Sequence, residues 1–159
     1  MNQFCTIETP IGLLEICADK NYVYKIQCVE NSIWGNKVIT KNRYSIIDQL
    51  ASEMIEYFYY DRKIFTVPFH IDISPFFNMV LKEVSKIKYG QTRSYFDIAR
   101  KVGNTKATRA VGIANSRNPL TILIPCHRII YSNGTLGGYN HGLEKKIFLL
   151  NHEGINISI

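Results

Sequence analysis

One segment of the chain, residues 118–130, has the sequence NPLTILIPCHRII and strongly limits the local structure that the chain can adopt there. Five apolar or β-branched residues precede Pro125, a pattern typical of a buried strand. A helix is excluded directly before Pro125, because the residue that precedes a proline is kept extended. The segment therefore predicts a buried strand whose end presents Cys126, with the imidazole of His127 beside it.

The size and composition of the chain indicate a globular protein. Its 159 residues are enough for one domain, or for a small domain joined to one of typical size. Hydrophobic residues make up 46% of the chain and charged residues 20%, so a core can be buried. No apolar run approaches the roughly 18 residues that a membrane span needs, and the first residues do not have the pattern of a secretory signal. We therefore expect a cytoplasmic protein that does not bind membranes.

The four cysteines are expected to be free thiols, because disulfides are rare in the cytoplasm. The chain has no C-x-x-C or H-x-x-x-H spacing, so we expect no metal site and no other cofactor. Cys5, Cys17 and Cys28 are interpreted as small hydrophobic residues on strand faces.

Cys126 differs from the other cysteines because His127 and Arg128 follow it directly. Basic neighbours lower the pKa of a thiol from about 8.5 and thereby increase the fraction of the nucleophilic thiolate. Cys126 is therefore a candidate nucleophile. The Cys-His pair taken alone also fits a buried structural thiol.

The first part of the chain has strand patterns followed by one helical pattern. β-rich runs at residues 4–10 and 12–19 are separated by a Pro-Ile-Gly turn signal, and residues 22–30 show partial alternation. Residues 45–62 carry apolar residues at helical spacing. Residues 63–71 contain a proline and are expected to form an extended linker.

The second part of the chain is mostly helical by the same criteria. Ser74 followed by proline is a helix start signal, and glycines or an Asn-Pro pair follow the later helices. A glycine-rich loop is expected at residues 133–142. The expected helices are residues 74–87, 92–103, 105–117 and 143–154.

Positive charge is concentrated in the second part of the chain. Residues 1–68 contain seven Lys and Arg against eight Asp and Glu, whereas residues 69–159 contain twelve against five. Residues 80–130 alone contain ten against two. Such a basic field favours a polyanionic partner, although a solvated basic surface gives the same pattern. We expect a sheet-plus-helix domain at residues 1–68 and a second domain at residues 69–159.

The two helices joined near Gly103 are a helix-turn-helix candidate. The second of them carries small residues at Ala107, Ala110 and Gly112, together with the long cation Arg109. Small residues let a helix backbone approach the narrow minor groove of DNA, with one arginine inserted into the duplex. The same small residues also suit an interior helix that packs closely against its neighbours.

Three stretches together closely resemble one protein family. They are RAVGIANSRNPLTILIPCHRII at residues 109–130, GQTRSYFDIA at residues 90–99 and GGYNHGLEKKIFLLNHEG at residues 137–154. The family is that of the methylated-DNA–protein-cysteine methyltransferases, also called O6-alkylguanine-DNA alkyltransferases. The resemblance covers residues 74–154. It implies an α/β (α+β) fold, with a small ribonuclease-H-like antiparallel sheet and a helix, then a mostly helical domain with a winged-helix-like helix-turn-helix.

The resemblance implies a role for each matching catalytic position. Cys126 would accept the alkyl group, and His127 would act as its base through a bound water. Glu153 would orient the imidazole, and Asn118 would hold the turn between the recognition helix and the active-site segment. Tyr95 would crowd the phosphate beside the target nucleotide and offer its hydroxyl to the guanine ring.

The resemblance also implies how DNA is bound. Arg109 would fill the gap left by an everted base. The other implied DNA contacts are Tyr95, Thr92, Ala107, Ala110 and Gly112. The implied pocket residues are Tyr139, Asn140, Gly138 and Pro125. Asn140-His141 departs from the residues that the family often has there, and this position borders the pocket.

The function implied is repair of O6-alkylguanine in double-stranded DNA by irreversible, stoichiometric transfer of the alkyl group to Cys126. Because the target atom cannot be reached inside a duplex, the base would be flipped through the minor groove. The protein would act as a monomer without a protein partner. A non-catalytic protein that binds alkylated bases and a cysteine hydrolase are the alternatives. The hydrolase gives no reason for the basic helix pair.

Overall fold

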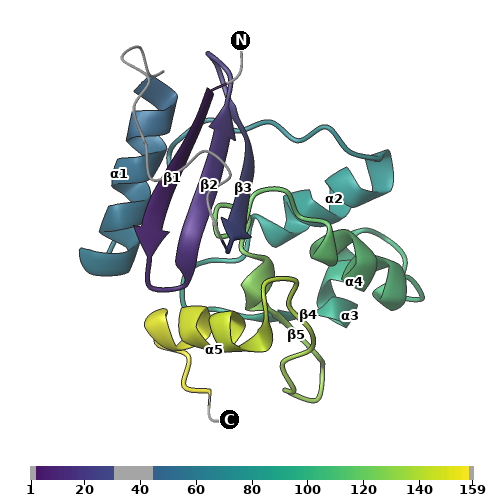
Figure 1. The fold of residues 1–159 in the computed structure, drawn as a ribbon. Helices are drawn as coiled ribbons and strands as arrows, with labels where there is room; N and C mark the ends of the chain where they lie inside the picture. The colour runs from purple at the N-terminus through teal and green to yellow at the C-terminus, as the bar shows by residue number, and fades with distance from the viewer. Residues whose placement is uncertain (1–2, 31–44, 158–159) are drawn as a thin grey trace. The chain divides into compact units, whose positions relative to one another are not determined.

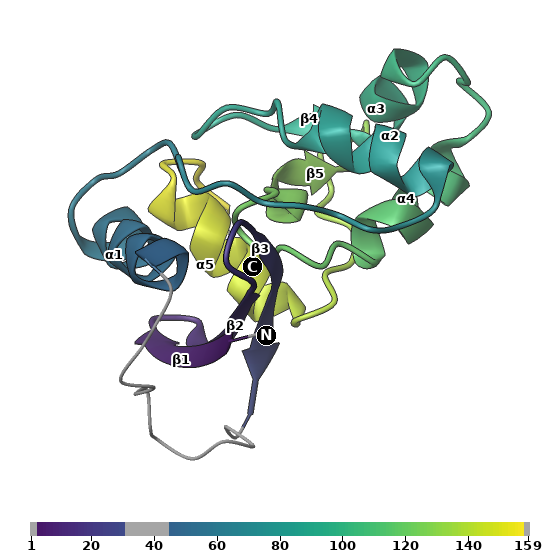
Figure 2. The same cartoon turned by 90° about the horizontal axis from the view of Figure 1, so that it is seen from above.

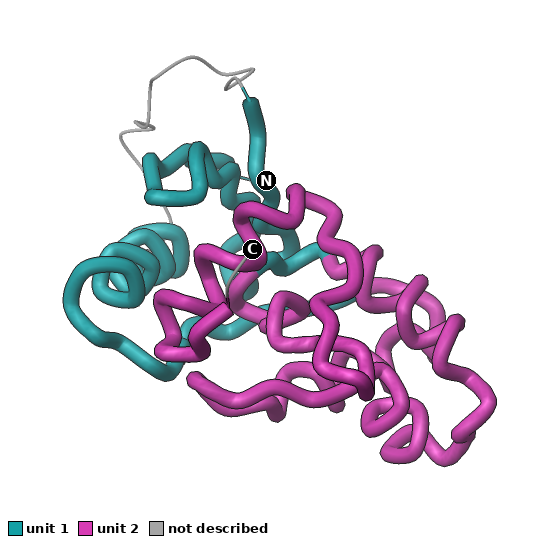
Figure 3. Tube along the Cα trace, turned by 90° about the horizontal axis from the view of Figure 1, so that it is seen from below, with its two compact units in different colours: residues 1–71, 119–121 teal, residues 72–118, 122–159 magenta. Residues whose placement is uncertain are grey.

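The computed structural model describes residues 3–30 and 45–157 (Figure 1). The chain divides into two compact units, shown in Figure 3. The first contains residues 1–71 and 119–121, and the second contains residues 72–118 and 122–159. The short segment 119–121 belongs to the first unit because it is bonded to β3 there. The predicted division into two independent domains, residues 1–68 and residues 69–159, stays a prediction.

The first unit contains a three-stranded antiparallel sheet in the order β1-β2-β3. Its strands are β1 (Gln3–Thr9), β2 (Gly12–Ala18) and β3 (Val23–Val29). Thr9 pairs with Gly12 across a tight hairpin, and the Thr9 hydroxyl donates to the Gly12 carbonyl at 2.7 Å. Gly12 has a φ of 104°, which few other residues adopt. The three strands predicted from the sequence are confirmed.

Helix α1 (Ser45–Tyr59) runs beside β1 and β2 (Figures 1 and 2). Ile47, Leu50 and Met54 are fully buried on its inner face. Burying each such side chain contributes about 1.5–3 kcal/mol. Ile55 belongs to the apolar residues of the predicted helix but is 46% exposed, because one residue beyond the buried Met54 its side chain is turned about 100° around the helix.

The second unit contains the remaining helices. Helices α2 (Pro75–Val84), α3 (Tyr95–Lys101) and α4 (Thr108–Ser116) pack on one another, and α5 (Leu143–His152) follows later (Figure 2). Among the described residues, no helix is long and apolar enough to cross a membrane. The predicted α+β fold class is confirmed.

Local signals explain where α3 begins and how it is joined to α4. The Ser94 hydroxyl accepts from the Asp97 backbone N–H at 3.0 Å, and the Asp97 carboxylate accepts from the Ser94 N–H at 2.9 Å. This reciprocal capping box fixes the start of α3. Gly103 takes a φ of 85° at the turn into α4. The winged-helix description of this region stays a prediction.

Two sequence predictions on these helices need correction. Ser74 occupies the N-cap of α2 but makes no side-chain capping hydrogen bond, and α2 ends at Val84 rather than at Ile87. Residues 92–94 were predicted to be helical. Instead, β4 (Arg93–Ser94) pairs in parallel with β5 (Ile129–Ile130), a contact between segments far apart in the chain.

The predicted strand that leads into Cys126 is wrong. Residues 120–124 form isolated bridges and a turn, and Cys126 begins a 3-10 helix, η1 (Cys126–Arg128). Ile122 has a φ of 71°, which reverses the chain direction within the apolar run and is a strained conformation for a β-branched residue. A strand does follow, but it is the two-residue β5.

Candidate active site

Cys126 is 5% exposed and is held through its backbone by neighbouring side chains. Its carbonyl oxygen accepts from the Asn115 side-chain amide at 3.2 Å. The Asn118 side-chain amide donates to the Ile124 carbonyl at 2.8 Å, on the other side of the proline. Two asparagines from α4 and its end therefore position the chain on both sides of Pro125.

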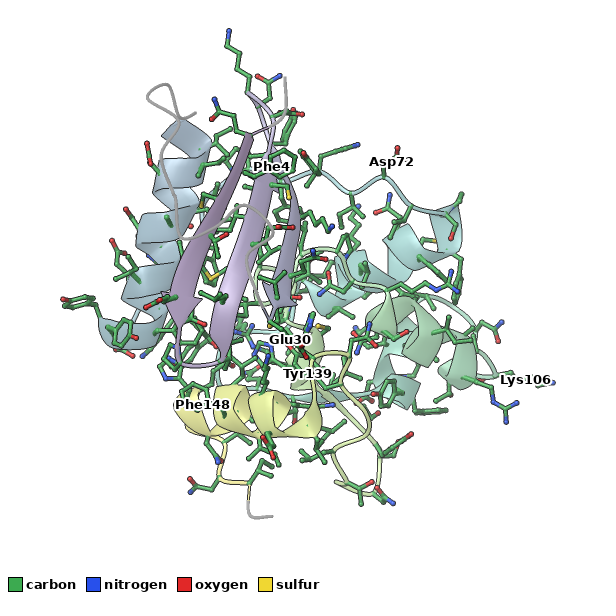
Figure 4. The ribbon with its side chains drawn as sticks, in the orientation of Figure 1. Phe4, Glu30, Asp72, Lys106, Tyr139 and Phe148 are labelled. Atoms are coloured by element: carbon green, nitrogen blue, oxygen red, sulfur yellow. The ribbon has the colours of Figure 1, made fainter. Side chains whose placement is uncertain are left out.

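A cleft of about 1000 Å³ lies in the second unit, and Cys126 forms part of its wall. Residues of α4 line one side, and the loop that precedes α5 lines another. Figure 4 shows Tyr139 on this loop, and Lys106 on the turn before α4 with its side chain directed away from the helices. The Asn140 side-chain amide donates to the Ser116 carbonyl, which ties the loop to the end of α4.

Behind Cys126, His127 and Glu153 form a buried hydrogen-bonded pair. His127 is fully buried, and its Nε2 lies 2.7 Å from Glu153 Oε1. Burial lowers the pKa of His127, so the imidazole is neutral near pH 7. Because a carboxylate can only accept, Nε2 carries the proton and Nδ1 is left as an acceptor. No described residue bonds to Nδ1.

Glu153 is the centre of a larger network. Arg128 donates to its two oxygens through Nε and Nη2, both at 2.8 Å, and the Gly90 N–H donates at 3.1 Å. Burial raises the pKa of Glu153, but the hydrogen bonds from His127 and Arg128 outweigh it, so the net shift is downward. Glu153 is therefore ionised at neutral pH, and Arg128 is engaged away from the sulfur.

The pKa of the Cys126 thiol is raised by burial, although Asn118, Lys146 and Tyr139 oppose the shift. The prediction that basic neighbours lower this pKa is therefore wrong for the structure. Desolvation of the sulfur is the largest effect, and Arg128 is directed to Glu153 and to the Ile87 carbonyl. The resting sulfur is a neutral thiol and needs a base before it can react.

Lys146 is a buried cation that sequence reasoning did not identify. Its side chain is fully buried, and Nζ donates to the carbonyls of Ile129 at 2.6 Å, Leu136 at 2.5 Å and Gly138 at 3.3 Å. Burial lowers its pKa to about 8. The lysine joins β5 to the glycine-rich loop. Lys146 lies three residues before the buried Leu149 on α5, and residues at this spacing share one face of a helix. This spacing could have predicted that Lys146 is buried.

Comparisons with known proteins identify the family. A family model described as 6-O-methylguanine DNA methyltransferase, DNA binding domain, matches residues 75–155. A constitutive methylated-DNA–protein-cysteine methyltransferase of Bacillus subtilis is 38% identical over 161 residues, which cover 98% of each chain. The chain belongs to the methylated-DNA–protein-cysteine methyltransferase family. A relative of this name from Methanosarcina acetivorans is 36% identical over 95% of this chain and 97% of its own.

Solved structures of this family have the same fold. The Mycobacterium tuberculosis O6-methylguanine methyltransferase is 31% identical, with a TM-score of 0.83 over 96% of this chain and 93% of its own. The Mycobacterium tuberculosis OGT in complex with DNA is 34% identical, with a TM-score of 0.81 over 94% of this chain and 91% of its own. The family predicted from the sequence is thereby confirmed.

The structure brings most of the implied family residues to the cleft. Tyr95 is 8% exposed there, and its ring centroid lies 5.1 Å from that of Tyr131. An added Cβ at Gly137 would lie 2.9 Å from the Tyr95 hydroxyl, so only glycine fits beside it. The implied residues that line the cleft are Tyr95, Arg109, Gly112, Asn118, Cys126, Gly138, Tyr139 and Asn140.

Other implied residues lie elsewhere. His127 and Glu153 are buried behind the cleft wall rather than on it. Thr92 lines a separate, smaller pocket. Ala107, Ala110 and Pro125 are not part of the cleft lining. Cleft residues that sequence reasoning had not assigned to the site include Lys106, Thr108, Ile113, Asn115, Ser116 and Tyr131.

The described residues offer no cluster for a metal ion. Within residues 3–30 and 45–157, no three His, Cys, Asp or Glu side chains are grouped so that they could hold one. The cysteines are free thiols.

Proposed function

We propose that this protein repairs O6-alkylguanine in DNA by moving the alkyl group to the sulfur of Cys126, once per molecule. The observation that carries the proposal is the placement of Cys126 on the wall of the cleft, next in the chain to the buried His127–Glu153 pair. A nucleophile, a base and a group that holds the base recur in enzymes with activated nucleophiles. Membership in a family named for this methyl transfer supports the assignment.

The proton of the thiol is removed first. Burial raises the pKa of Cys126 and lowers that of His127, so proton transfer between them is uphill at rest. The Nδ1 atom of His127 is the available acceptor, and we infer that a water connects it to the thiol. Glu153 stabilises the imidazolium that forms, because it is ionised and lies 2.7 Å from Nε2.

The sulfur then attacks the alkyl carbon. A carbon–sulfur bond forms, the bond between that carbon and guanine O6 breaks, and O6 keeps the electron pair. The guanine takes up a proton and leaves as the normal base. A hydroxyl donor such as Tyr95 lowers the cost of the departing oxyanion. The product is a thioether, which has no easy reverse route, so one protein molecule repairs one base.

The target base must leave the duplex before it can reach the cleft. Eversion costs a few kcal/mol, and less for a poorly paired lesion. Arg109 is exposed on α4 and lines the cleft, where it can occupy the gap in the stack. The small residues Ala107, Ala110 and Gly112 let the helix approach the minor groove, with Thr92 as a further contact. Tyr139, Asn140, Gly138 and Pro125 form or support the pocket walls.

The remaining expectations complete the proposal. We infer that the protein acts as a cytoplasmic monomer on double-stranded DNA, without a metal or other cofactor. The presence of a thiol at position 126 favours transfer over mere binding of the damaged base.

Intact-mass measurement after incubation with a duplex that contains O6-methylguanine tests the proposal. We expect a gain of one methylene in mass per molecule, located on Cys126 by fragmentation and absent in Cys126→Ser. Cys17→Ser is the matched control, because Cys17 is also a buried thiol and should leave the gain unchanged. Binding to the damaged duplex with no change in mass would favour the non-catalytic alternative. Removal of several methyl groups per molecule would contradict the single-use mechanism.

A further inference from the structure

The His127–Glu153 pair joins two segments that lie 26 residues apart in the chain. A third segment, the bridging turn (residues 87–90), lies between α2 and β4 and contacts both of them. On the first side, the Arg128 guanidinium donates through Nη1 to the Ile87 carbonyl at 2.5 Å. The bridging turn is therefore bonded to the residue that follows His127 in the chain.

On the second side, the bridging turn holds the end of α5. The Tyr89 hydroxyl donates to the His152 carbonyl at 3.1 Å, and the Gly90 N–H donates to Glu153 Oε2 at 3.1 Å. The Tyr89 ring also packs against the Arg128 guanidinium, whose Cζ lies 5.9 Å from the ring centroid. Because Arg128 donates to both oxygens of Glu153, the bridging turn holds the carboxylate and its cation together.

Gly90 occupies a position where a side chain would disturb Glu153. Its φ is 73°, a conformation that other residues rarely adopt. An added Cβ would lie 3.2 Å from the backbone carbonyl oxygen of Glu153, so this backbone would have to shift. Gly134 is also exposed and has a φ of 85°, but no atom lies within 4 Å of an added Cβ there. Gly134 is therefore a matched control for the backbone strain alone.

We propose that the bridging turn positions Glu153 against His127, and that Gly90 and Tyr89 are positioning residues for methyl transfer. This inference rests on the proposed function. Neither Gly90 nor Tyr89 lines the cleft, so both act through Glu153. The Gly90 N–H and Arg128 Nε both bond to Oε2, and this arrangement turns Oε1 toward Nε2 of His127.

A positioning role predicts a loss of rate that depends on pH. At pH 7 the thiol gives its proton to His127, and a displaced Glu153 would stabilise the imidazolium less well. At higher pH hydroxide removes the thiol proton, so the rate depends less on His127. A variant that is only less stable would instead lose rate in proportion to its unfolded fraction at every pH. The titratable side chains that interact with His127 or the thiol, besides Glu153, stay unchanged in the variants: Tyr95, Arg128, Tyr139 and Lys146.

The test measures single-turnover methyl transfer from a saturating O6-methylguanine duplex at about pH 7 and about pH 9.5. We expect Gly90→Ala to be about 10-fold to 100-fold slower at pH 7, as for a weakened hydrogen bond to a charged group, and to recover most of this loss at the higher pH. Tyr89→Phe loses one neutral hydrogen bond and keeps the ring, so it should be about 2-fold to 10-fold slower at pH 7. Gly134→Ala should react as fast as the unchanged protein at both pH values.

The outcomes separate this inference from the proposed function. No transfer to the unchanged protein would overturn the proposed function and, with it, the inference. An unchanged rate in Gly90→Ala, or a loss of the same size at both pH values, would overturn the positioning role and leave the function intact. Equal losses in Gly90→Ala and Gly134→Ala would do the same, because backbone strain would then explain both. If Gly90→Ala does not fold, Tyr89→Phe decides, and an unchanged rate at pH 7 would overturn the inference.

Discussion

Each unit buries a glutamate with a lowered pKa and an arginine nearby, and the two glutamates differ in that Glu153 is also bonded to an imidazole. Glu53 in the first unit is 3% exposed and accepts from the Thr66 hydroxyl at 2.5 Å, the Thr66 N–H at 2.9 Å and Gln49 Nε2 at 3.0 Å. Burial raises the pKa of Glu53, but these hydrogen bonds together lower it by a larger amount, so the net shift is downward. None of these donors gains or loses a proton near neutral pH. Glu53 therefore has a structural role, in which it holds the chain segment that follows α1.

Glu153 in the second unit is 5% exposed and is held by an imidazole and a guanidinium. The imidazole of His127 can gain and lose a proton near neutral pH, and it is next in the chain to Cys126. In the proposed mechanism Glu153 supports the reaction because one of its donors can titrate beside a nucleophile. Glu53 shares the burial and the lowered pKa but has no such donor among the partners named above.

Glu153→Gln should cause the largest loss. The amide would no longer stabilise the imidazolium, and the corresponding change in a Ser-His-Asp enzyme slows the reaction about 10⁴-fold. We therefore expect methyl transfer to slow by about 10²-fold to 10⁴-fold in single-turnover measurements. Stability should also fall by about 3–5 kcal/mol in denaturant unfolding, because the Arg128 guanidinium loses its buried partner. A transfer rate close to that of the unchanged protein would refute the assigned role.

Glu53→Gln should cost stability without affecting methyl transfer. We expect a loss of about 2–3 kcal/mol in denaturant unfolding, because buried donors lose a charged acceptor. The rate of the folded fraction should stay unchanged, since no partner of Glu53 reaches the cleft. If Glu53→Gln and Glu153→Gln slowed the reaction equally, the contrast between the two glutamates would fail.

Lys146 extends the comparison to a buried cation held by carbonyl acceptors alone. Its pKa is about 8 in the folded state, and a lysine in the unfolded chain has a pKa of about 10.4. Between these values the unfolded chain binds more protons than the folded protein, so deprotonation of Lys146 in the folded protein adds stability as the pH rises. The stability of the unchanged protein relative to Lys146→Met should therefore increase by about 2 kcal/mol between pH 8 and 10. A difference that is constant with pH would contradict the lowered pKa.

The smallest predicted effect is a change in folding stability at acidic pH. Because the pKa of Glu53 is lowered by folding, its contribution is complete above the unfolded value of about 4.3 and is lost as the pH falls toward the folded value. The stability advantage of the unchanged protein over Glu53→Gln should therefore shrink as the pH falls below about 4.3. Glu144→Gln, at an exposed position of α5, serves as the control. An advantage that grows in acid would reverse the assigned sign.

Local patterns were sufficient to predict most helices and strands. The turn after Thr9, the capping pair at the start of α3 and the spacing of Ile47, Leu50 and Met54 all act between residues a few positions apart. Such signals can be recognised without knowledge of the fold. The exposed Ile55 marks their limit, because the spacing of apolar residues does not by itself show which of two adjacent ones, Met54 or Ile55, is buried.

The site was only partly predictable. The resemblance named Cys126, His127 and Glu153, and the structure places the imidazole against a carboxylate that lies 26 residues further along the chain. No local pattern distinguishes Asn115, whose importance depends on a carbonyl 11 residues away. Lys146 had a usable signal in its spacing from Leu149, but its three carbonyl partners come from distant segments.

The sequence by itself determined the residue types at the site, their order and the family, because motif spacing is a property of the chain alone. Tertiary structure decided two things that the sequence left open. It bends the apolar run at Ile122, so that Cys126 begins a helical turn rather than ending a strand. It also removes water from the Cys126 thiol, and desolvation then outweighs the neighbouring cations and raises the pKa. Both follow from packing between distant segments, which no local pattern encodes.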